Sequence, residues 1–184
     1  MLVKSFGSAV FGIDATTITI EVDVTNGIKF MLVGLPDSAV KESQQRIESA
    51  LRLNGFKWPK FKIIINMAPA DIRKEGSAYD LPLAAGVLAA SQQVNPEKLS
   101  KYILMGELSL DGTLQPIKGA LPIAINARAE GFEVAVLARF EGEDRAEGAE
   151  APHFLECGGG FDIAHHIGAA EAQQRIARFV YRDR

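Results

Sequence analysis

Three features common in other protein classes are missing from this chain. Its 184 residues include one cysteine, Cys157, which excludes an intrachain disulfide and is typical of a reducing compartment, so we expect a cytoplasmic protein. No apolar run approaches the roughly 18 to 20 residues that span a bilayer. The first residues lead into an alternating strand pattern rather than a signal peptide, so we expect no membrane association.

Patterns for nucleotide and metal binding are also missing. No GxxxxGKS or GxxxxGKT sequence occurs, and Gly158-Gly159-Gly160 lacks the lysine and hydroxyl residue of a P-loop, so this chain should not hydrolyse ATP. His153, Cys157, His165 and His166 fit no standard zinc spacing, so we expect no metal site. The net charge of −3 argues against a dedicated basic nucleic-acid module but allows a local basic patch.

The order of periodic segments indicates an α/β fold with a mixed sheet. Strands alternate with helices, and a hairpin turn at Asp111-Gly112 makes one strand pair antiparallel, which excludes a pure doubly wound sheet. Asp37 or Ser38 is expected to cap the first helix. The expected strands are 2–12, 16–24, 28–33, 61–67, 102–108 and 134–137, and the expected helices are 38–53, 81–92 and 121–129.

The character of the chain changes near residue 140. Residues 140–150, FEGEDRAEGAE, carry five acids and one base without apolar periodicity, which is typical of a solvated linker. The 47% hydrophobic content is enough for one sizeable core. We therefore expect one domain over residues 1–139, followed by an acidic linker and tail over residues 140–184. Divergence, truncation and a shifted reading frame are the alternative origins of this tail.

Four long motifs resemble one protein family. The most informative is NMAPADIRKEGSAYDLPLAAGVLAAS (66–91), which joins a strand end, a charged loop and a helix start. This segment resembles the amino-terminal domain of the ComM/YifB group of Mg-chelatase-like AAA+ ATPases, a domain similar to the proteolytic domain of Lon. The resemblance implies a ribosomal-protein-S5-domain-2-like fold. The other motifs are FGSAVFGIDATTITIEVDV (6–24), MLVGLPDSAVKESQQRIESAL (31–51) and MGELSLDGTLQPIKGALPIAINARAEGF (105–132).

The resemblance also implies that the protease chemistry is lost. Lon-like proteases use a serine nucleophile and a lysine whose pKa is lowered by burial. Carried over residue by residue, the serine position falls on Ala78 and the lysine position on Leu121. We therefore expect no catalytic residue in this chain. The alternative is a residual serine hydrolase built on Ser77, for which Lys118 is a poor base because it precedes a helix at a solvated position.

The charged loop from Arg73 to Asp80 is the first candidate site. One interpretation is a binding or subunit-contact loop formed by Arg73, Lys74, Glu75, Gly76, Ser77 and Asp80. The other is a solvated turn in which Asp80 caps the next helix and Arg73 or Lys74 forms weak surface ion pairs. Because the loop lacks the nucleophile, we expect its charges to bind a protein surface or ligand and to be dispensable for folding.

The segment KWPKFK (57–62) is the second candidate site. Lys57, Lys60 and Lys62 could contact phosphates while Trp58 stacks on a base. In the alternative, Trp58 and Phe61 are core or rim residues and the lysines keep a sheet edge soluble.

Taken together, these features predict a non-catalytic domain that assists assembly or DNA engagement of a branch-migration type motor in transformation and recombination. The family resemblance implies a hexameric homo-oligomer and DNA as partners. It also implies that ATP and Mg²⁺ are used by an ATPase domain outside this chain, whose own residues need no cofactor. A stand-alone nucleic-acid-binding module is a further alternative.

Overall fold

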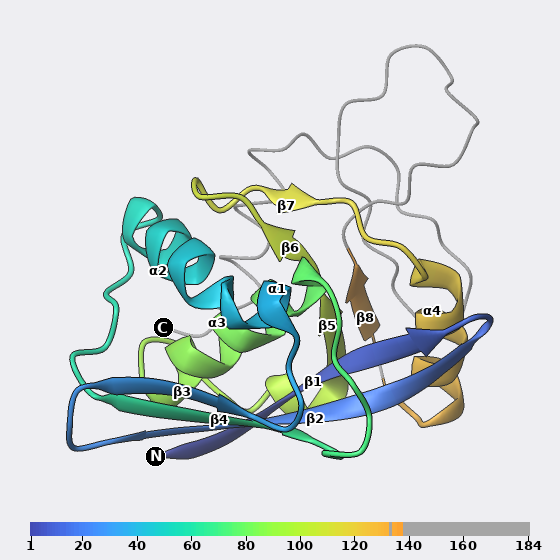
Figure 1. The fold of residues 1–184 in the computed structure, drawn as a ribbon, viewed down its shortest axis with the longest axis horizontal. Helices are drawn as coiled ribbons and strands as arrows, with labels where there is room; N and C mark the ends of the chain where they lie inside the picture. Colours follow the sequence, from blue (N-terminus) through green and yellow to red (C-terminus); the bar gives the residue numbers. More distant parts are fainter. Residues whose placement is uncertain (133, 138–184) are drawn as a thin grey trace, which may run out of the picture.

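Six strands form one twisted sheet in the computed structural model, which describes residues 1–132 and 134–137 (Figure 1). The acidic tail expected over residues 140–184, with its histidines and cysteine, lies outside the described residues. The strand order is β3-β4-β2-β1-β5-β8. The strands are β1 (Leu2–Phe11), β2 (Asp14–Thr25), β3 (Lys29–Val33), β4 (Lys62–Ala68), β5 (Tyr102–Met105) and β8 (Val134–Leu137).

The sheet is mixed, as expected from the sequence. β2 pairs antiparallel with both β1 and β4, whereas β3 lies parallel to β4, and β5 lies parallel to β1 and β8. This confirms the α/β class with a mixed sheet. The finer assignment to the ribosomal-protein-S5-domain-2-like fold stays a prediction.

The alternation along β2 decides which sheet face becomes the core. Ile18, Ile20 and Val22 are fully buried, and they lie opposite Gly7, Ser5 and Val3 of β1 in register. Successive side chains of a strand point to opposite faces, so these residues share one face. That face carries the main core of the molecule.

Helices cover both faces of the sheet. On the core face, α3 (Asp80–Ala90) packs on β1 and β2, and α2 (Ser43–Leu53) packs against α3. On the other face, α4 (Ala120–Ala129) packs on β2 and β8, and Asn126 donates to the Thr17 hydroxyl at 3.2 Å. Every residue of α3 is buried. Two short 3₁₀ turns complete the helical segments, η1 (Ser77–Tyr79) and η2 (Leu99–Lys101).

Two expected elements are interrupted. The helix expected over 38–53 divides at Glu42 into α1 (Ser38–Lys41) and α2, and the Asp37 carboxylate caps α1 by accepting from the Val40 N–H at 2.8 Å, as predicted. The strand expected over 102–108 ends at Met105, because the backbone of Gly106 leaves the sheet and pairs with Ala78 and Leu81 around the start of α3. The following residues form a separate hairpin of β6 (Glu107–Leu108) and β7 (Leu114–Gln115), joined by the predicted turn at Asp111-Gly112.

Within the part of the chain that the structure describes, no helix combines the length and apolar character needed to cross a bilayer.

Candidate functional site

The loop from Arg73 to Asp80, called here the 73–80 loop, begins with a buried cation. Lys74 follows exposed Arg73 in the sequence, yet its side chain is fully buried. Its Nζ donates to the carbonyl oxygen of Gly34 at 2.7 Å and to that of Pro69. These carbonyls follow β3 and β4, so one ammonium group joins two strand ends. Burial lowers the pKa of Lys74, and the nearby Asp71 carboxylate partly opposes that shift.

The backbone of the same loop is paired with the β3–α1 connection. The Lys74 N–H donates to the Leu35 carbonyl at 3.2 Å, and the Lys74 carbonyl accepts from the Asp37 N–H at 3.0 Å. The second carboxylate oxygen of Asp37 accepts from the Gly76 N–H at 3.0 Å. Asp37 therefore caps α1 with one oxygen and holds the 73–80 loop with the other.

A buried carboxylate ends the loop. Asp80 is fully buried, and Arg46 of α2 donates to both of its oxygens, at 2.7 and 3.0 Å. The Leu108 N–H of β6 donates to the same carboxylate at 3.1 Å. Burial raises the pKa of Asp80, while the hydrogen bonds from Arg46 and Leu108 oppose that shift. The side chain thereby ties α2, α3 and β6 together.

This arrangement corrects two sequence-based interpretations. Asp80 is not the N-cap of α3, because Tyr79 holds that position and Asp80 is the first helical residue. A fully buried carboxylate requires charged or hydrogen-bonding partners, and Arg46 provides them. Lys74 is likewise not at the surface, so the expectation of a solvated side chain is wrong at that residue. Its burial also argues against the expectation that the loop is dispensable for folding.

The solvated interpretation holds for the other charged residues of the loop. Arg73 and Glu75 are each 65% exposed and form an ion pair at 3.1 Å, a surface interaction of small energetic value. These two side chains are the exposed residues of the loop, and Gly76, Ser77 and Ala78 are half-buried. Whether one binds there stays a prediction.

Among the described residues, the Ser77 hydroxyl has a carboxylate acceptor and no lysine partner. This hydroxyl donates to the Glu107 carboxylate of β6. Ala78, at the position that the family resemblance gives to the nucleophile, carries no hydroxyl, and Leu121, at the lysine position, is 63% exposed on α4. Lys118 is exposed, as expected. The described residues therefore contain no Ser–Lys pair in the positions of a Lon-like dyad.

The second candidate cluster leads into β4, whereas the 73–80 loop contacts Pro69 just after this strand. Lys57 and Lys60 are exposed, whereas Lys62 is half-buried at the start of β4. The Trp58 ring is half-buried and tilted against Phe30, with centroids 5.8 Å apart. One ring face is therefore engaged inside the protein, which favours the rim interpretation of Trp58.

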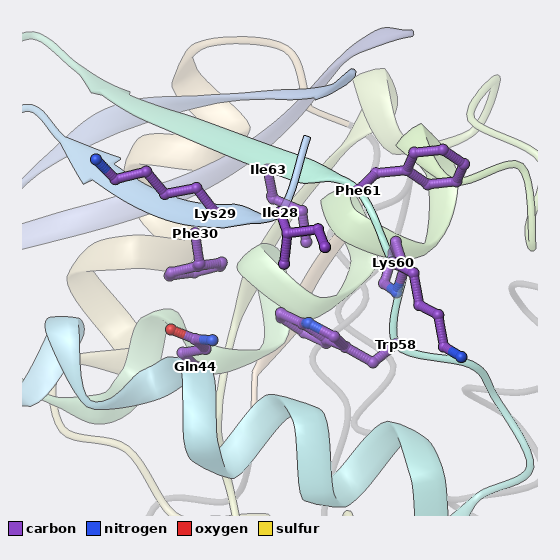
Figure 2. A pocket seen from close by; sticks show the side chains of 9 residues that line it. Ile28, Lys29, Phe30, Gln44, Trp58, Lys60, Phe61 and Ile63 are labelled. Carbon is purple, nitrogen blue, oxygen red and sulfur yellow. The ribbon is translucent and has the colours of Figure 1, made fainter. Parts of the chain in front are cut away.

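An apolar groove of about 360 Å³ opens beside this ring. Ile28 stands over Trp58, and Gln44 of α2 approaches Phe30 (Figure 2). The side chains of Lys29 and Lys60 extend outward at opposite ends. The residues lining this groove, called here the β3 groove, are Ile28, Lys29, Phe30, Gln44, Trp58, Pro59, Lys60, Phe61 and Ile63.

Two residues of the first site were missed at the sequence level, Arg46 and Glu107. The sequence contained one indication that a cation such as Arg46 would be needed. Asp80 directly precedes the wholly apolar stretch LPLAAGVLAA, so a buried acid there needs a cation from another element. Among residues 1–132 and 134–137, no group of three or more His, Cys, Asp or Glu is placed to hold a metal ion.

Comparison with known proteins gives a family match and several relatives. Residues 20–141 match the family described as subunit ChlI of Mg-chelatase. The chain is 44% identical to the uncharacterized protein YifB of Escherichia coli over 129 residues, 70% of this chain and 26% of YifB. It is 42% identical to competence protein ComM of Haemophilus influenzae over 132 residues, 71% of this chain and 26% of ComM.

A weaker similarity points to Lon. Lon protease 2 of Bacillus subtilis is 28% identical over 100 residues, 54% of this chain and 18% of that protease. The chain spans about a quarter of the length of YifB and ComM. Because the ChlI match covers most of the chain and two relatives exceed 40% identity, the chain belongs to the Mg-chelatase-like ChlI family, in the group that includes YifB and ComM.

Proposed function

We propose that this chain is a non-catalytic N-terminal domain that helps a Mg-chelatase-like AAA+ ATPase assemble and engage DNA during transformation or recombination. Its membership in the group of competence protein ComM supports a role connected with competence. In this proposal ATP and Mg²⁺ bind to the part of the relatives' length that lies beyond this chain. The assembled motor is a homo-oligomer, expected as a hexamer, and it works in the cytoplasm.

One observation carries the non-catalytic part of the proposal. The lysine of the 73–80 loop donates to two backbone carbonyls, so it connects strand ends instead of activating a nucleophile. A general base must reach the proton that it removes, and the Ser77 hydroxyl donates to Glu107 rather than to a lysine. The geometry of the loop therefore supports a structural role.

A hydrolysis assay tests this part of the proposal. The purified chain should cleave casein and hydrolyse ATP only at background rates, because Ala78 and Leu121 replace the dyad and no P-loop occurs in the sequence. The alternative of a residual serine hydrolase built on Ser77 would need Glu107 as its base, because Glu107 is the acceptor of the Ser77 hydroxyl. Casein turnover that disappears in Ser77→Ala would establish that alternative and reject the proposal.

The exposure of Lys57 and Lys60 favours the second part of the proposal, that the domain engages DNA. If these lysines contact phosphates, the chain should bind single-stranded DNA weakly. Lys57→Glu with Lys60→Glu should then reduce the salt dependence of log K by about one to two units. Fluorescence anisotropy at several salt concentrations gives this slope.

The control is Lys41→Glu with Lys118→Glu, which makes the same charge change at two exposed positions away from the cluster. It should leave the slope within about half a unit of the parent value. Equal slopes for the parent and the Lys57/Lys60 variant would assign those lysines to solubility alone.

A further inference from the structure

The two most exposed large apolar side chains of the described residues are Ile28, 92% exposed, and Ile13, 90% exposed. Ile13 lies in the β1–β2 turn, and Ile28 lies in the β2–β3 turn. The two turns lie at opposite ends of the molecule (Figure 1). Strand β2 joins them, and its 12 residues span roughly 40 Å at a rise of about 3.4 Å per residue. Each turn presents an apolar surface that the described residues leave uncovered.

The two surfaces differ in shape. The β1–β2 turn, called here the hairpin tip (Phe11, Gly12, Ile13 and Asp14), is a protrusion in which Phe11 is also exposed. Ile28 instead forms one wall of the β3 groove, with the Trp58 ring facing it (Figure 2). The volume of about 360 Å³ is near the lower end of the about 300 to 1,000 Å³ found for ligand pockets, which is room for a large side chain.

The two surfaces also differ in charge. The hairpin tip carries one acid, Asp14, and no base. The β3 groove is lined by two cations, Lys29 and Lys60, and by no acid. A tip placed in the groove would bring Asp14 toward these lysines, and complementary charge across a contact favours the correct partner and register.

Strand β3 supplies a further feature beside the groove. Among the described strands it pairs only with β4, so its second edge is open. Exposed edges carry unpaired backbone groups that can pair with another chain. A β-hairpin from a second molecule presents its own backbone to such an edge.

We propose that the hairpin tip of one copy of this chain inserts into the β3 groove of the next copy, with Phe11 or Ile13 against Ile28 and Trp58. Because the tip and the groove are different surfaces at opposite ends, the contact is head-to-tail. Repeating it builds a ring when the rotation closes and a filament when it does not. This inference rests on the assembly role proposed above and names the surfaces that perform it.

The contact is small, and small interfaces bind weakly. In an oligomer joined through another domain, the effective concentration of a tethered partner reaches about the millimolar range. A weak contact between these domains then suffices to fix their order around a ring. The isolated chain should therefore associate only at high concentration.

The experiment is sedimentation velocity of the 184-residue chain in a concentration series up to about 1 mM, the range in which a weak contact is measurable. The parent should show concentration-dependent association. Ile13→Ser, which alters the tip, and Ile28→Ser, which alters the groove, should each weaken it about tenfold or more. Leu110→Ser removes another exposed apolar side chain, in the β6–β7 hairpin, and should associate like the parent.

Mixing the two variants distinguishes a head-to-tail contact from a symmetric one. The Ile28→Ser chain keeps an intact tip and the Ile13→Ser chain keeps an intact groove, so an equimolar mixture should form one-to-one dimers and no larger species. Trp58, the single tryptophan, should shift its emission to shorter wavelength in the mixture. Ile13 and Ile28 are almost fully exposed, so both variants should keep the parent's unfolding midpoint, which confirms that each is folded.

A parent that stays monomeric up to about 1 mM would overturn the inference, and so would a mixture that fails to dimerise. Dimerisation of either variant alone, as strong as the parent's, would assign association to a different surface and would also overturn it. Loss of single-stranded DNA binding in Ile28→Ser, with association unchanged, would assign the groove to nucleic acid. None of these measurements involves hydrolysis, so the inference and the non-catalytic proposal can fail separately.

Discussion

At the residue scale, two buried charges of opposite sign hold the 73–80 loop against its neighbours. Lys74 joins the ends of β3 and β4 through backbone carbonyls, and Asp80 joins α2 to β6 through Arg46 and the Leu108 N–H. A buried charge is costly unless every partner is present. Each of these side chains is therefore sensitive to the loss of one partner.

Asp80→Ala should lower the free energy of unfolding by about 3 kcal/mol or more, because it leaves the Arg46 guanidinium without its buried partner. Loss of a simple N-cap would lower it by only about 1 kcal/mol. Urea denaturation of Asp80→Ala, Arg46→Ala and the double variant measures both the loss and the coupling. A loss near 1 kcal/mol, additive with that of Arg46→Ala, would show that Asp80 acts only at the helix start.

The sequence predicted some of these residues and missed the roles of others. Asp37 was one of two residues predicted to cap the first helix, because an aspartate side chain before a helix start can accept from an unpaired backbone N–H. The burial of Lys74 was not predictable locally, since RKEGS has the composition of a solvated turn and its acceptors lie five and 40 positions away. Ser77 and Glu107 are 30 positions apart, so only the folded topology brings them together.

At the element scale, the strand and helix order was predictable and the breaks were not. Strict alternation along β2 and the apolar stretch after Pro82 are strong local signals. The end of β5 at Met105 has a tertiary cause, because the Gly106 N–H donates to the Ala78 carbonyl at 2.7 Å and its own carbonyl accepts from Leu81 at 3.0 Å. These hydrogen bonds end the strand at Met105, although the sequence predicted a strand through Leu108.

Close contact between α3 and β2 leads to a second stability prediction. A Cβ atom at Gly86 would lie 2.6 Å from a methyl group of Val22, inside the fully buried core. Gly86→Ala should therefore lower the free energy of unfolding by about 1 to 3 kcal/mol through overpacking, although alanine is the better helix former. Chemical denaturation measures the sign and size of this change in the free energy of unfolding. A gain in stability would show that the α3–β2 contact is looser than the structure indicates.

At the scale of the whole molecule, the 73–80 loop connects elements that lie far apart in the sequence. It binds the β3–α1 connection through Asp37 and Leu35, and it binds the β5–β6 connection through Gly106. Three segments that the family motifs carry thus meet at one place. These hydrogen bonds give the loop a structural role in joining the three segments, which is the observation behind the non-catalytic role proposed above.

The comparison of Lys74→Ala with Arg73→Ala tests this account most directly, because the two substitutions remove neighbouring positive charges of the same loop. Arg73→Ala should change the free energy of unfolding by no more than about 0.5 kcal/mol, since its side chain is exposed. Lys74→Ala should lower it by at least about 2 kcal/mol, because two buried carbonyls lose their donor. Equal, small changes in both variants would show that the loop is a solvated turn and would contradict the structural role on which the proposed function rests.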